Sequence, residues 1–362
     1  MFDRILLYVG PPKTGTTSIQ SFVWKNRAAL MAQGFYVPKS GRAGGQHIEL
    51  PAVLAKNAPA ARKKRLNKQA NIDEGAGDER REKLFADLDR ELSGAPRCHT
   101  LMFMSEAIFR SEKAEAHAYR EALGSYSGRL ESLMYLRRQD RWLGSRTLQN
   151  RKAGVRDGVR MSAGTPDGFA ANVRAWHSES DRCHIRRFDQ EFLLNASLLQ
   201  DFCDAIGADP SGLDMTEIWH NSAVLQEQLE LVDALNDKIG ALPFKRQIQS
   251  RRRFLSLCSA TLGGTRIEFP RDVAVEVFES FGEINQWLHD TVDPGGPPLF
   301  FNTDFGRYAE APVNDGRYTM EQLGRLLAEI SSDAVPEIER SARIDQIVSA
   351  FEAARGSAGW RR

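Results

Sequence analysis

Cysteine is scarce in this chain, and the few cysteines are scattered. Cys98, Cys183, Cys203 and Cys258 form no C-x-x-C pair, and no histidine stands at ligand spacing from any of them. A structural zinc site built on paired cysteines is therefore excluded, and no other metal site is predicted. We predict free, mostly buried thiols in a protein of a reducing compartment.

An excess of one charge and long hydrophobic runs are absent as well. Lysine and arginine number 49 against 48 acidic residues, a net charge of +1, which predicts no nucleic-acid partner. No apolar run reaches the roughly 18 residues of a membrane-spanning helix. The first five residues include an acid, and only a short apolar run follows, which predicts no signal peptide. We expect a cytoplasmic protein, and the sequence leaves its oligomeric state open.

Short apolar runs recur along the chain and alternate with helical stretches. The runs lie at residues 5–9, 100–104, 133–136 and 183–188. This rhythm is typical of a parallel sheet covered by helices on both faces. The fold class predicted is α/β, with a P-loop-like parallel sheet flanked by helices.

One domain over residues 1–362 is predicted, and no internal repeat is found. It includes a charged insertion at 57–97, expected to be mobile or partly helical, and a helical C-terminal extension at 304–362. Further helices are expected over 222–240, 271–292 and 319–355.

The segment at residues 10–17 carries the most specific motif. It has the frame G-x-x-x-x-G-x-[ST], but Thr16 stands where a nucleoside triphosphatase has its lysine. The lysine lies inside the loop instead, at Lys13. Gly15 allows backbone N–H groups to curl around an anion, and the helix that follows adds the positive end of its dipole. We predict a phosphate site; the alternative is an ordinary turn between a strand and a helix.

A second segment follows the run at 133–136. Arg137 comes directly after this predicted strand, and Ser145 lies eight residues later, about two helical turns on. A guanidinium and a hydroxyl that converge in this way suit a second phosphate group. The alternative is a solvated helix start with ordinary charges.

The two segments together resemble the nucleotide-binding signatures of the sulfotransferase superfamily, which uses 3′-phosphoadenosine 5′-phosphosulfate (PAPS). Residues 12–17 are similar to its 5′-phosphosulfate loop, and Arg137 with Ser145 is similar to its 3′-phosphate motif. Residues 281–288 and 298–300 resemble the C-terminal region of bacterial glycan-type homologues. Gln139 departs from the pattern, because the family has proline there. The PAPS ligands that the resemblance implies are Lys13, Thr14, Gly15, Thr16, Thr17, Ser18, Arg137 and Ser145.

The resemblance implies metal-independent, in-line transfer of a sulfuryl group to a hydroxyl or amine of a carbohydrate-like acceptor, leaving adenosine 3′,5′-bisphosphate. Lys13 is then the cation for the leaving oxygen. Glu106, which follows the run at 100–104, and His47, which follows Gly44 and Gly45, are the two candidate general bases. Each has a plainer alternative, a helix-start acid for Glu106 and a lone surface histidine for His47.

Two rival functions remain open. One is a P-loop kinase or nucleoside triphosphatase with a degenerate loop, which would need an acidic Mg²⁺ ligand at a strand end. The other is a non-catalytic nucleotide-binding module. The basic run at 62–68 is either a solvated face or a contact for an acidic substrate.

Overall fold

The computed structural model describes residues 1–73, 76–152, 165–216 and 271–308. The chain divides into two compact units. The first comprises Met1–Trp142, Met161–His220 and Phe278–Thr303, and the second comprises Leu143–Arg160, Asn221–Val277 and Asp304–Arg362. Most of the second unit lies outside the described residues, as do the helices predicted over 222–240 and 319–355. The single domain and the C-terminal extension therefore stay predictions.

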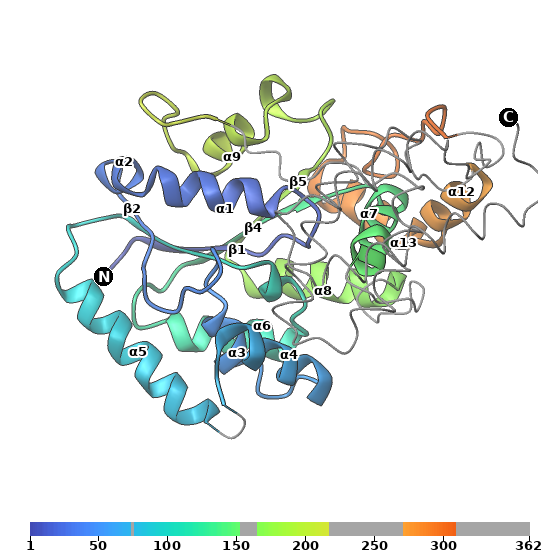
Figure 1. The fold of residues 1–362 in the computed structure, drawn as a ribbon. Helices are drawn as coiled ribbons and strands as arrows, with labels where there is room; N and C mark the ends of the chain where they lie inside the picture. The colour runs from blue at the N-terminus through green and yellow to red at the C-terminus, as the bar shows by residue number, and fades with distance from the viewer. Residues whose placement is uncertain (74–75, 153–164, 217–270, 309–362) are drawn as a thin grey trace, which may run out of the picture. The chain divides into compact units, whose positions relative to one another are not determined.

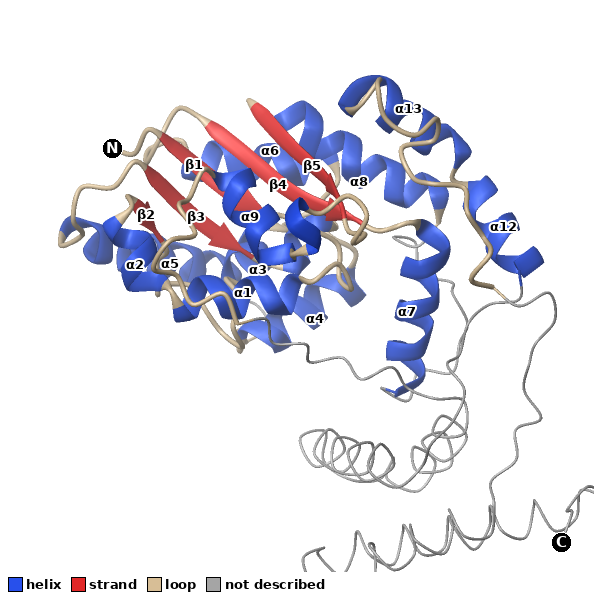
Figure 2. Ribbon diagram, turned by 90° about the horizontal axis from the view of Figure 1, so that it is seen from above, coloured by secondary structure: helices blue, strands red, loops and turns tan. Residues whose placement is uncertain are grey.

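A five-stranded, all-parallel sheet forms the centre of the first unit, which confirms the α/β class (Figure 2). The strand order is β2-β3-β1-β4-β5. The strands are β1 (Arg4–Tyr8), β2 (Phe35–Tyr36), β3 (Thr100–Met104), β4 (Leu130–Leu136) and β5 (Arg182–Arg187). β1 lies between β3 and β4, with Ile5 opposite both Leu101 and Leu130. The chain thus extends the sheet first to one side of β1 and then to the other.

Helices cover both faces of the sheet (Figure 1). One face carries α1 (Thr16–Lys25), α2 (Arg27–Ala32) and α9 (Leu198–Ile206). On the other side lie α3 (Glu49–Leu54), α4 (Ala60–Ala70), α5 (Gly77–Ser93), α6 (Lys113–Leu123) and α8 (Pro166–Glu179). The remaining described helices are α7 (Gln139–Lys152), α12 (Arg271–Ser280) and α13 (Gly282–Val292), with two short 3₁₀ turns, η1 (Glu106–Phe109) and η3 (Leu194–Ala196).

Alternate strand residues build the core against α1 and α9. Leu6 and Tyr8 of β1 pack in one buried cluster with Phe22 of α1 and Phe202 of α9. The rings of Phe22 and Phe202 meet edge to face at 6.1 Å between centroids. Because both faces are covered, the central strands read as continuous apolar runs, which is why the sequence located them.

The charged insertion at 57–97 is largely helical where it is described. Leu66 and Ala70 of α4 and Leu84 and Leu88 of α5 are buried, so each helix has one apolar side despite its many charges. The cysteines that the structure describes are free, as predicted: Cys98 and Cys203 are buried and Cys183 is half-buried. Cys258 lies outside the described residues. In the described part of the chain, no helix has the length and apolarity to cross a membrane.

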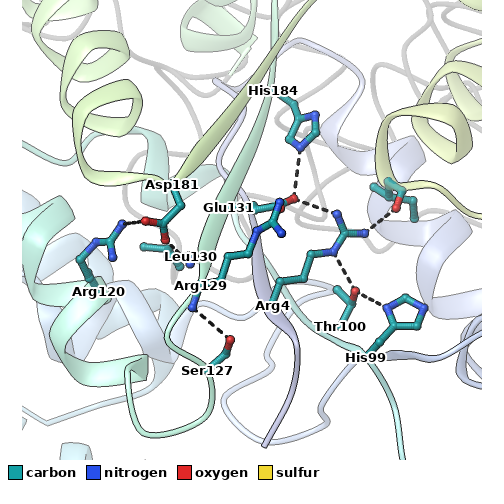
Figure 3. A network of polar contacts seen from close by, with 11 residues as sticks. Arg4, His99, Thr100, Arg120, Ser127, Arg129, Leu130, Glu131, Asp181 and His184 are labelled. Atoms are coloured by element: carbon teal, nitrogen blue, oxygen red, sulfur yellow. Dashed lines mark hydrogen bonds and ion pairs between the residues drawn. The ribbon is translucent and has the colours of Figure 1, made fainter.

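A buried carboxylate, Glu131, lies where β1, β4 and β5 begin (Figure 3). Its side chain is 0% exposed, and Arg4 Nη1 donates to Glu131 Oε2 at 2.8 Å. Arg129 approaches Oε1 at 2.6 Å and His184 Nε2 lies 3.2 Å from Oε2. Burial alone would raise the pKa of Glu131, but His184, Arg4 and Arg129 together hold it below its ordinary value. The network fastens the three strands at the edge opposite their carboxyl ends.

Glu131→Gln is expected to destabilise the fold by about 3 kcal/mol, because it leaves partly buried cations without their anion. A carboxylate whose folded pKa is lowered stabilises the fold above its unfolded pKa, and this contribution is lost as the pH falls through the lower folded value. Urea unfolding at pH 7 and below pH 4 measures it. The deficit of the variant should shrink at the lower pH, whereas the exposed control Glu79→Gln should change little at either. An equal deficit at both pH values would assign the effect to packing.

Candidate active site

The loop between β1 and α1 has a special backbone. Lys13 and Gly15 both have positive φ, 73° and 76°. A side chain at Gly15 would clash as well, because a Cβ there would lie 2.3 Å from Leu198 Cδ2 and 2.8 Å from Phe188 Cε2. Lys13 adopts the left-handed conformation without being glycine, a costly feature that is concentrated at functional sites.

Two hydrogen bonds fix the loop. The Thr14 hydroxyl, which is buried, donates to the Pro11 carbonyl at 2.7 Å. The indole of Trp142 donates to the Pro12 carbonyl at 2.9 Å, and Trp142 is itself 1% exposed. Trp142 follows β4, so it joins the segment after β4 to the loop after β1. The two segments that the sequence singled out are thus in direct contact.

The N-terminus of α1 offers its backbone N–H groups without competition from a capping side chain. Gly15 is the N-cap, no side chain caps the helix, and its first turn contains no acid. The first turn instead carries three hydroxyls, on buried Thr16, half-buried Ser18 and exposed Thr17. Such a helix end favours an anion.

Glu106 lies beside this helix end. It opens η1 directly after β3, and Ser105 before it caps η1 by accepting from the Ala107 N–H at 3.3 Å. The Thr16 hydroxyl donates to Glu106 Oε2 at 3.1 Å. The carboxylate at the end of β3 is therefore joined to the first turn of α1, a contact that the sequence did not predict.

Arg137 and Glu106 both lie within electrostatic range of Lys13. Burial and the Arg137 guanidinium lower the pKa of Lys13, while the Glu106 carboxylate acts in the opposite direction. Lys13 and Arg137 are thus close enough for their positive charges to repel each other. A bound anion would relieve the repulsion between Lys13 and Arg137.

Arg137 and Arg138 are neighbours with different roles. Arg137 follows the last residue of β4 and lies over the Phe188 ring at 5.8 Å, close to the space that a Cβ of Gly15 would enter. Arg138 is 2% exposed and forms two bonds to Asp140, at 2.9 and 2.8 Å. It also donates to Asn302 Oδ1 at 2.8 Å. The guanidinium of Arg138 thus stabilises the fold by bonding to other residues of the protein.

Gln139, the residue found in place of the family's proline, also has a structural partner. Its amide donates to Asn285 Oδ1 at 2.7 Å and accepts from Asn285 Nδ2 at 3.2 Å, with both residues fully buried. The pair ties the start of α7 to α13. Ser145 lies on α7 in the second compact unit, so its position beside Arg137 stays a prediction.

The surroundings of His47 argue against a role as general base. It is 2% exposed, its Nδ1 accepts from the Met104 N–H at 3.0 Å, and its Nε2 donates to the Pro38 carbonyl at 2.9 Å. Burial lowers its pKa to about 4. Both ring nitrogens are occupied, so the expectation of an accessible histidine in a glycine loop is corrected. His47 joins the loop after β2 to the end of β3, and it leaves the list of base candidates.

The fold and site together define an α/β protein with a polar cluster of both charges at the carboxyl edge of a parallel sheet. No family model, curated protein or solved structure matches the chain. Within the described ranges, no group of three His, Cys, Asp or Glu residues is arranged to hold a metal ion. The function is therefore inferred from the residues of the site.

Proposed function

We propose that the protein is a PAPS-dependent sulfotransferase that acts on a hydroxyl or amine of a polar, carbohydrate-like acceptor. One observation carries the proposal: Lys13, Arg137 and Glu106 gather at the uncapped N-terminus of α1. The site lies at the carboxyl ends of β1, β3 and β4, where the order of the strands changes direction along the chain. Ligands of open α/β sheets bind at this kind of position.

The residues present fit a donor with two phosphate positions. The loop N–H groups, Lys13, Thr17 and Ser18 would hold the 5′-phosphosulfate, in the manner of a P-loop. Arg137, which follows the neighbouring strand β4, would hold the 3′-phosphate, the role that the resemblance gives it. The hydroxyls of Thr14 and Thr16 serve the site indirectly in this assignment, because one donates within the loop and the other holds Glu106.

PAPS supplies a sulfuryl group bonded to a phosphate oxygen that becomes the leaving group. The chain has two tasks in its transfer. Glu106 accepts the proton of the attacking hydroxyl, oriented by its hydrogen bond from Thr16. Lys13 stabilises the negative charge that develops on the leaving oxygen. Trp142 keeps Lys13 in place by holding the carbonyl of the preceding residue, Pro12.

The Glu106 carboxylate also gives specific support to a second function. P-loop enzymes hold Mg²⁺ with a carboxylate at a strand end and with the hydroxyl residue that follows the motif lysine, and Glu106 and Thr17 stand at these two positions here. A kinase would, however, need its phosphate-binding lysine at position 16, where this chain has threonine. We favour the sulfotransferase for this reason.

The proposal is tested by the variant Arg137→Ala and two nucleotides. It should bind adenosine 3′,5′-bisphosphate more weakly by about 1.5–3 kcal/mol, the value of a charged hydrogen bond, while its affinity for adenosine 5′-phosphate stays nearly unchanged. Isothermal titration calorimetry measures both. Equal losses for the two nucleotides would show damage to the adenosine pocket or the fold and would remove Arg137 from the 3′-phosphate site.

A further inference from the structure

The basic helix α4 presents two arginines on one side. Arg62 and Arg65 are three residues apart and therefore neighbours on the helix surface; Arg62 is half-buried, and Arg65 is exposed, as are Lys63 and Lys64 between them. The sequence left open whether this run is a solvated face or a contact for an acidic substrate. The Arg62 side chain is only 14% exposed, so the run is more than a solvent-facing surface.

Only one nitrogen of the Arg62 guanidinium has a hydrogen-bond partner in the described part of the chain. Nη1 donates to Glu115 Oε2 of α6 at 2.7 Å, and the Glu115 side chain is 5% exposed. Nε and Nη2 are buried and have no hydrogen-bond partner in the described part of the chain. Buried donors are nearly always paired, so an acceptor brought by a ligand would stabilise the Arg62 guanidinium once its side chain turns toward the surface.

Arg65 connects this helix face to the proposed site. Burial and Arg62 lower the pKa of Arg65, and the Glu106 carboxylate acts in the opposite direction, so Arg65 lies within electrostatic range of both. Glu106 in turn accepts from Thr16 at the start of α1. Glu106 therefore lies within electrostatic range of both Arg65 of α4 and Lys13 of the loop before α1.

We propose that Arg62 and Arg65 form an acceptor subsite that selects molecules with a carboxylate or sulfate group near the hydroxyl that is modified. The inference rests on the proposed function, because it takes Glu106 as the base. The anion would bind the exposed Arg65, and the Arg62 guanidinium would turn toward it to pair its remaining N–H groups. An acidic glycan can form this interaction with the two arginines, whereas a neutral sugar has no anionic group to form it.

Direct binding tests the subsite without relying on turnover. Hexagalacturonate and its fully methyl-esterified, uncharged form share one skeleton and differ only in their carboxylates. Titrated calorimetrically into the full chain, the charged sugar should bind at least about tenfold more tightly, as expected for one charged hydrogen bond. Arg65→Ala should remove most of this preference and leave the affinity for the uncharged form unchanged.

Lys64→Ala is the matched control, because it removes the same charge from the same helix outside the arginine pair. Equal binding of the two sugars by the native protein, or equal effects of Lys64→Ala and Arg65→Ala, would overturn the subsite. Arg62 is better changed to lysine than to alanine, since alanine would leave the buried Glu115 without its partner. Titration of adenosine 3′,5′-bisphosphate in parallel separates the two claims: failure of the nucleotide alone contradicts the proposed donor, and failure of the acidic sugar alone contradicts the subsite.

Discussion

Lys13→Ala is expected to lower the rate of sulfuryl transfer by about 10²–10³ while changing the affinity for adenosine 3′,5′-bisphosphate far less. The reason is that Lys13 acts mainly on charge that appears in the transition state, and loss of one such contact has this typical cost. Alanine keeps a Cβ, so the positive φ of 73° at this position is no more strained than before. Transfer of ³⁵S from labelled PAPS, together with calorimetry, measures the two quantities.

Lys25→Ala is the control for Lys13, since Lys25 lies at the other end of α1 and forms an exposed ion pair with Asp214. It should leave the rate almost unchanged. The lowered pKa of Lys13 adds a second test, because its charge is lost at a lower pH than that of an ordinary lysine. The alkaline fall in rate should move to higher pH in Lys13→Arg. Parallel losses of rate and affinity in Lys13→Ala would remove Lys13 from the transition state.

Glu106→Gln is expected to reduce transfer by about 10²–10⁴, the range for loss of a general base, while donor binding survives. Glutamine keeps the shape of the side chain and an oxygen that can accept from Thr16, so the loop should stay in place. Glu112→Gln serves as the control, because Glu112 is exposed and lies in the same connection after β3. A near-normal rate in Glu106→Gln would show that another group takes the proton. His47 is a poor replacement, since backbone groups occupy both of its nitrogens.

The parallel sheet explains which parts of the site were predictable. Lys13, Glu106 and Arg137 each follow a buried apolar run, and the carboxyl ends of parallel strands meet at one edge. Knowing only the strands, one can therefore expect the three residues to gather, and Arg137 and Glu106 do lie within electrostatic range of Lys13. The two-residue strand β2 was missed because it is too short to give a periodic pattern.

Side-chain partners were harder to predict, because they come from distant segments. Nothing local distinguishes Arg137 from Arg138, yet Arg138 bonds to Asn302, 164 positions away. His47 looked like a loop histidine because Gly44 and Gly45 precede it, and both glycines do form a tight turn with φ of 60° and 95°. The burial of its ring depends on β3, which the local sequence does not contain. The hydrogen bond from Trp142 to Pro12 could not be predicted from the local sequence either. A large aromatic residue soon after the predicted strand did, however, indicate a residue that packs against a neighbouring segment.

Binding of adenosine 3′,5′-bisphosphate with and without Mg²⁺, compared with binding of ATP, tests the central claim most directly. The sulfotransferase account predicts that the bisphosphate binds equally well in EDTA and in Mg²⁺, and that it binds more tightly than ATP under both conditions. Tighter binding of ATP that requires Mg²⁺ would contradict this account and would assign Glu106 and Thr17 to a metal-dependent kinase or nucleoside triphosphatase.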